Sequence, residues 1–112
     1  MQITLNIDKA VAALGGNTGL YKKVLVRFND SYRNAASVIS EHLSAGELQD
    51  AERLAHTLKG LAGNIGAEEL VQASLELEMA IKSNNGKAPD LLTTFSEVLE
   101  YTLLAIQKQL QA

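Results

Sequence analysis

His56 is the residue in this sequence whose type and neighbours best fit covalent chemistry. It stands in the segment Ala-His-Thr-Leu-Lys-Gly-Leu-Ala-Gly-Asn-Ile-Gly at residues 55–66, with Lys59 three positions on and Gly60 four positions on. An imidazole has an unperturbed pKa of about 6.5, so its neutral form is a competent nucleophile near pH 7. His56 could therefore attack an aspartyl phosphate. Lys59 would offset the charge of the arriving phosphoryl group and disfavour protonation of the ring.

The apolar pattern of this segment predicts that His56 faces solvent from a helix. Hydrophobic residues recur three and four positions apart, at Leu48, Ala51, Ala55, Leu58 and Ala62. At about 100° per residue, His56 lies roughly 140° from the centre of this stripe. Gly60 and Gly63 follow on the same side, although a mid-helix glycine costs up to about 1 kcal/mol relative to alanine. We interpret Gly60 as clearance for a docking protein, with close helix packing as the alternative; helix termination explains Gly63 equally well.

The elements that must position these residues are all predicted to be helices. Ala, Leu, Glu, Lys and Gln dominate, and no sustained period-2 alternation is present. The apolar spacing predicts helices over about 8–14, from 17 or 18 to 43, from about 47 to between 63 and 66, over about 67–82, and from about 89 to 110. Asp8 is a plausible N-cap of the first helix. Short connections favour antiparallel neighbours, so we expect an all-α, antiparallel four-helix bundle with a short extra N-terminal helix as a lid.

Composition limits the classes of protein to which the chain can belong. Its 112 residues fit a single domain over 1–112. The formal net charge is -3, with no basic cluster, which argues against a nucleic-acid partner. No cysteine is present, and neither a metal-ligand set nor a phosphate-binding glycine loop lies near His56, so we predict no cofactor of its own. No apolar run or secretory leader is evident, which predicts a soluble, cytoplasmic domain without direct membrane contact.

The segment around His56 resembles the motif of histidine-containing phosphotransfer (HPt) domains, an H-x-L-K-G core followed by small residues and a glycine. Upstream, the chain resembles the opening of HPt domains found at the C-terminus of hybrid sensor kinases, in Ile7-Asp8, Ala13-Leu14-Gly15-Gly16-Asn17, Leu20-Tyr21 and Phe28. The resemblance implies that His56 is the phosphoacceptor, Lys59 the phosphate-side cation and Gly60 the clearance position.

The same resemblance implies a role in two-component signal transduction. The domain would be a non-enzymatic phosphorelay intermediate, which accepts a phosphoryl group from a receiver-domain aspartate and passes it to another receiver domain. Its partners would be response-regulator receiver domains and a hybrid sensor histidine kinase. The receiver, with its bound Mg²⁺, would supply the catalytic groups.

Several residues keep alternative interpretations. Gln72 or Glu78, on the adjacent predicted helix, could hydrogen-bond the second imidazole nitrogen, and the sequence does not choose between them. The simplest interpretation of the acidic residues, Asp8, Glu52, Glu76, Glu78 and Glu97, is that they lie on solvated helix faces. His42 is predicted to be structural, at the C-terminal end of its helix.

Two other functions compete with the phosphocarrier. One is the dimerisation and phosphoacceptor segment of a histidine kinase, in which an acidic residue usually follows the histidine; here Thr57 does. The other is a helical adaptor that binds a partner through its bundle surface, with His56 incidental.

Overall fold

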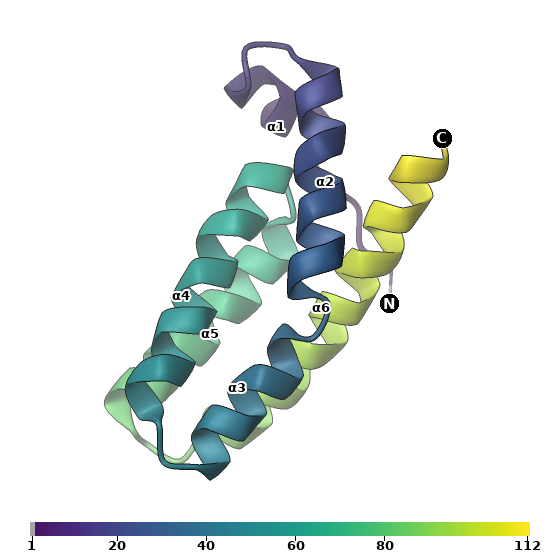
Figure 1. Cartoon of the computed structure of the whole chain (residues 1–112). Helices are drawn as coiled ribbons and strands as arrows, with labels where there is room; N and C mark the ends of the chain where they lie inside the picture. The colour runs from purple at the N-terminus through teal and green to yellow at the C-terminus, as the bar shows by residue number, and fades with distance from the viewer. Residues whose placement is uncertain (1) are drawn as a thin grey trace.

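Residues 2–112 are described by the computed structural model, and over this range the chain contains helices and no strand. The helices are α1 (Ile7–Ala13), α2 (Thr18–Tyr32), α3 (Ala35–Ser44), α4 (Leu48–Ile65), α5 (Glu68–Ser83) and α6 (Ala88–Gln111). Together α2 and α3 form one arm of the bundle, α4, α5 and α6 form the other three, and α1 lies at one end (Figure 1). The predicted antiparallel four-helix bundle with a short N-terminal helix is confirmed.

The single helix predicted from residue 17 or 18 to 43 is wrong, because the chain turns at Arg33 and Asn34. Asn34 has φ -99° and ψ 13°, away from helical dihedrals. Asparagine interrupts helices readily, since its short side chain competes for nearby backbone hydrogen bonds. Because of this change of direction, α2 packs mainly on α6 and α3 mainly on α4, although each of them contacts both of these helices (Figure 1).

The starts of α1 and α2 are each capped by an asparagine side chain. Asn6, rather than the predicted Asp8, caps α1, and its side-chain oxygen accepts from the Lys9 N–H at 3.3 Å. Asn17, one of the two residues predicted to open this helix, caps α2 by accepting from the Leu20 N–H at 2.9 Å. These caps satisfy backbone donors that have no partner within their own helix.

The core fills the space between the four arms. Its largest fully buried apolar side chains come from α2 to α6, namely Tyr21, Leu25, Ile39, Leu58, Ile65, Leu70, Leu77, Phe95 and Ile106. Fully burying one large apolar side chain contributes about 1.5–3 kcal/mol, so this set is the main stabilising contribution to the bundle. Each of α2, α4, α5 and α6 supplies two of these residues and α3 supplies one, so every arm contributes to the core.

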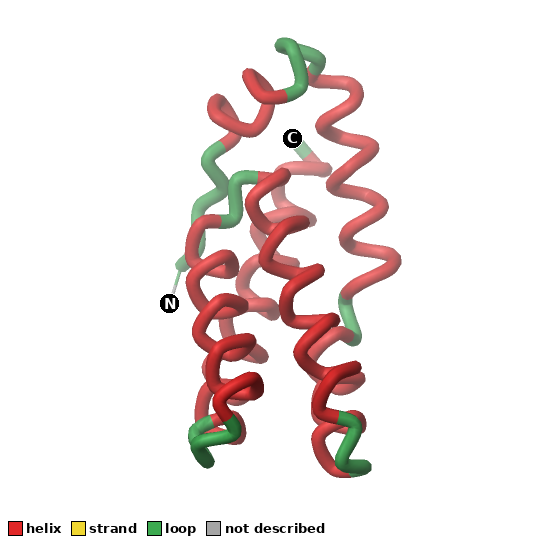
Figure 2. Tube along the Cα trace, turned by 90° about the vertical axis from the view of Figure 1, so that its left-hand side faces the viewer, coloured by secondary structure: helices red, strands yellow, loops and turns green. Residues whose placement is uncertain are grey.

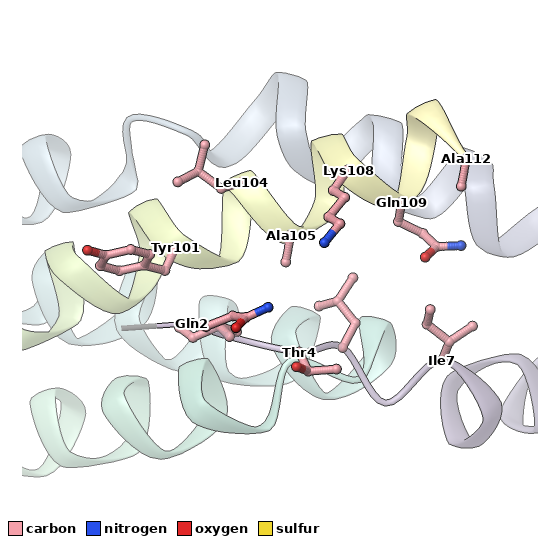
Figure 3. A pocket seen from close by; sticks show the side chains of 11 residues that line it. Gln2, Thr4, Ile7, Tyr101, Leu104, Ala105, Lys108, Gln109 and Ala112 are labelled. Atoms are coloured by element: carbon pink, nitrogen blue, oxygen red, sulfur yellow. The ribbon is translucent and has the colours of Figure 1, made fainter.

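An extended N-terminal segment, residues 2–6, adds to the core in a way that the helical pattern does not predict. Ile3 and Leu5 are buried, and the segment enters α1 through a stretch without regular structure (Figure 2). It lies along the last turns of α6, where Tyr101 and Lys108 help to line a pocket of about 540 Å³ (Figure 3). No lining residue belongs to α4 or α5, so this pocket is separate from His56.

Candidate functional site

Helix α4 presents His56 to solvent, as its apolar pattern predicts. Ala51, Ala55, Leu58 and Ala62 form its buried stripe and are fully inaccessible. The His56 side chain, on the other side, is 65% exposed. Leu48 was expected to belong to this stripe and does not. It is the first residue of α4 and is 38% exposed. The buried stripe therefore fixes the direction of His56 without covering its ring.

The C-terminal end of α4 is held by two contacts from distant parts of the chain. The buried Tyr21 hydroxyl donates to the Ile65 carbonyl at 2.8 Å, and burial raises the pKa of Tyr21. Gly66 then ends the helix with φ 78°, and the Asn6 N–H donates to its carbonyl at 2.8 Å. This sharp ending turns the chain directly into α5, which forms the most extensive helix pair of the fold with α4.

The antiparallel packing of α4 and α5 places Glu78 opposite His56. The Glu78 Oε2 lies 2.9 Å from the His56 Nδ1, and its Oε1 accepts from the Lys59 Nζ at 2.8 Å. Gln72, the other candidate, instead donates to Glu76 on its own helix at 3.1 Å. The simplest interpretation of Glu78, as a solvated charge, is wrong, because its side chain is only 15% exposed and both oxygens have partners.

The charge of Glu78 decides the tautomer of a neutral His56. Burial raises the pKa of Glu78, but hydrogen bonds from Lys59 and His56 outweigh this effect, and the net pKa is lowered. The carboxyl group is therefore ionised at neutral pH and can only accept hydrogen bonds. The proton of a neutral ring consequently lies on Nδ1, which leaves the lone pair on Nε2.

Lys59 lies beside His56, but its ammonium contacts the carboxylate. Its side chain is 28% exposed and forms an ion pair with Glu78 at 2.8 Å. The sequence predicted that Lys59 supports a phosphoryl group, and in the structure one turn of α4 separates it from His56. Its role as the phosphate-side cation remains a prediction.

The surface above His56 is open at the two glycines. A Cβ added at Gly60 would meet no atom within 4 Å, and one at Gly63 would only reach the Val71 Cγ2 at 4.0 Å. The alternative of close helix packing at Gly60 is therefore wrong. Backbone from another molecule can approach α4 closely here, one turn beyond His56.

His42 lies in the last turn of α3, where its helix meets the start of α4. Its Nδ1 lies 2.9 Å from the Glu47 Oε1, and the Glu47 N–H donates to the His42 carbonyl at 2.8 Å. With Asp50, these residues bring three potential metal-ligand atoms within 4.8 Å of one another. We assign no metal to them, because Asp50 pairs with Arg53 and the N-terminal end of α4 carries a positive partial charge.

Fold and site together define a helical bundle that displays one histidine on an open surface. The family model of the Hpt domain matches residues 23–112, and the chain belongs to this family. Comparisons with curated proteins and with solved structures found no match. Hpt domains are phosphocarriers rather than classical enzymes, so membership implies histidine phosphotransfer in two-component phosphorelays, with receiver domains as partners. None of the helices over residues 2–112 is long and apolar enough to cross a membrane.

Proposed function

We propose that His56 accepts a phosphoryl group on Nε2 from the aspartyl phosphate of one receiver domain and passes it to the aspartate of another. The observation that carries this proposal is the hydrogen bond between Nδ1 and Glu78, since it leaves Nε2 as the free nucleophile on a ring that is 65% exposed. A hybrid sensor kinase, as the sequence resemblance implies, is the proposed source of the phosphoryl group.

No proton leaves the His56 ring during the proposed transfer. The Nε2 lone pair forms the N–P bond while the P–O bond to the aspartate breaks, and the aspartate leaves as a carboxylate. The ring keeps its Nδ1 proton and becomes a phosphoimidazolium, whose positive charge the Glu78 carboxylate offsets at 2.9 Å. Return of the phosphoryl group to a second receiver reverses these steps. We propose that Mg²⁺ acts from the receiver and that this domain contributes no cofactor.

The direct test is to incubate the protein with a phosphorylated receiver domain and Mg²⁺. We expect an acid-labile, base-stable label on this chain, as a phosphohistidine requires, and loss of the label when a second, unphosphorylated receiver is added. A folded protein that binds the receiver and never acquires the label would support the adaptor function instead.

Lys59→Ala should leave a folded protein that transfers more slowly and loses its phosphoryl group sooner. One preorganised electrostatic group can contribute about 10²-fold or more to a rate, and partial exposure reduces this, so we expect a decrease of about 10-fold. Single-turnover transfer from the receiver and the phosphohistidine half-life measure both effects. Lys22→Ala, an exposed lysine on α2, is the control and should leave both unchanged. Equal transfer rates and phosphohistidine half-lives in Lys59→Ala and the unaltered chain would contradict an electrostatic role of Lys59 in transfer.

Substitutions at Gly60 separate helix stability from docking. Gly60→Ala should raise the free energy of unfolding by about 0.4–1 kcal/mol, since it adds helix propensity in open space. Gly60→Gln should also remain stable, yet weaken receiver binding and slow transfer, because its side chain would lie one turn above His56. Thermal melts and transfer rates measure the two effects. Gly19→Gln, at a helical glycine of α2, is the control and should leave transfer unchanged. If Gly60→Gln were destabilised and still transferred at the normal rate, the role of Gly60 in receiver docking would be contradicted.

A further inference from the structure

Glu78 is the common partner of both groups assigned to phosphoryl transfer. Its Oε1 binds the Lys59 ammonium at 2.8 Å and its Oε2 binds the His56 ring at 2.9 Å. The carboxylate comes from α5, whereas both of its partners come from α4, and it is the most buried of the three side chains. In the unphosphorylated protein, Lys59 is therefore bound at the Nδ1 side of the ring, through Glu78, and not at Nε2.

Phosphorylation of His56 would change this balance in two ways. The phosphoryl group brings up to about two negative charges to Nε2, more than the single charge on Glu78. The phosphoimidazolium also carries a positive charge beside Oε2, so Glu78 no longer depends on Lys59 for its neutralisation. Both changes favour transfer of the ammonium from the carboxylate to the phosphoryl oxygens.

Lys59 can make this movement without any change in the helices. Its Cα lies one turn from that of His56 on the same helix, and its flexible four-carbon stem carries a compact charge. The side chain is 28% exposed and has one acceptor among the described residues, which is Glu78. Breaking that one contact frees the ammonium.

We propose that Glu78 is a positioning residue that holds Lys59 in the unphosphorylated protein and releases it to the phosphoryl group when His56 is modified. This inference rests on the proposed function of His56 as the phosphoacceptor. The ion pair between Lys59 and Glu78 would then exist in the unphosphorylated protein. In the phosphorylated protein, Lys59 would contact the phosphoryl group instead.

The test follows the Lys59 ammonium by ¹⁵N NMR in the full chain before and after phosphorylation. Phosphoramidate serves as a small-molecule phosphoryl donor, His42→Gln removes the second histidine, and the ³¹P spectrum verifies the label on His56. Before phosphorylation, Glu78→Gln should shift the Lys59 resonance strongly. Phosphorylation should shift the Lys59 resonance in the protein that retains Glu78. In the phosphorylated state, Glu78→Gln should change the Lys59 resonance little.

Glu76→Gln is the matched control, because it removes the same charge from α5 at a residue that contacts Gln72 and not Lys59. It should leave the Lys59 resonance unchanged in both states. A correlation between the Lys59 ammonium protons and the phosphohistidine ³¹P nucleus, without any substitution at Glu78, is a second readout and should appear.

Two results would overturn the inference. One is a Lys59 resonance that does not respond to phosphorylation, and the other is an equally strong effect of Glu78→Gln in both states. Phosphoramidate labels the ring without a receiver, so either result would leave the proposed function standing. Failure of a phosphorylated receiver to label His56, despite normal labelling by phosphoramidate, would instead contradict the proposed function. If phosphoramidate gives no label, the phosphorylated receiver is used as the donor.

Discussion

Replacing His56 with glutamine should abolish phosphoryl transfer completely and leave the fold intact. The amide of glutamine has no nucleophilic lone pair comparable to that of Nε2, so no phosphorylated form can accumulate. Its N–H groups can still donate to Glu78, and the position is 65% exposed, so the free energy of unfolding should change by no more than about 0.5 kcal/mol. Labelling by a phosphorylated receiver measures the first effect, and chemical denaturation measures the second.

His42→Gln is the control for this experiment, because His42 is the other histidine of the chain and also lies beside a glutamate, at 2.9 Å. It should retain full transfer. Loss of labelling in His42→Gln, with labelling retained in His56→Gln, would show that the phosphoacceptor has been assigned to the wrong histidine.

The largest effect on stability is expected from Gly66→Ala, at the end of α4. Gly66 has φ 78°, a conformation that costs an L-residue about 1–2 kcal/mol. A Cβ there would also overlap the backbone carbonyl oxygen of Asn6 and lie 2.9 Å from its carbon. We expect a loss of about 3 kcal/mol or more in the free energy of unfolding, and a fall of roughly 10–20 °C in Tm. A thermal melt measures this directly.

Gly46→Ala separates the two contributions, since Gly46 has nearly the same φ, 75°, but no atom within 4 Å of an added Cβ. It should show only the conformational cost of about 1–2 kcal/mol. Equal losses of stability in the two variants would contradict a cost from the overlap of the added Cβ with Asn6.

The sequence predicts what depends on local periodicity. Residues spaced three and four apart define the buried stripe of α4, so the outward direction of His56 follows from the sequence alone. The open space at Gly60 also follows from local sequence, because a glycine in the middle of a helix lowers its stability and clearance for a docking protein would account for it. The break at Asn34 does not follow from the periodicity, since the apolar spacing continues across it, although asparagine interrupts helices readily and α3 packs on α4 and α6 beyond the turn.

The partner of the His56 ring depends on how two helices align, which periodicity does not determine. Gln72 and Glu78 are both polar residues of α5, six positions apart. The turn at Gly66 sets the register between α4 and α5, and this register brings Glu78 to the level of His56. A sequence shows the turn residue but not the resulting alignment.

The anchoring of α4 by residues near the start of the chain has a consequence for excising or transplanting this domain. The family model begins at residue 23, beyond the buried Ile3 and Leu5 and beyond Tyr21, whose hydroxyl binds the end of α4. A fragment cut at that boundary would keep His56 and the motif around it but lose the contacts that hold the Ile65–Gly66 end of α4. In chimeric signalling proteins, the recombination junction should therefore lie before Ile3.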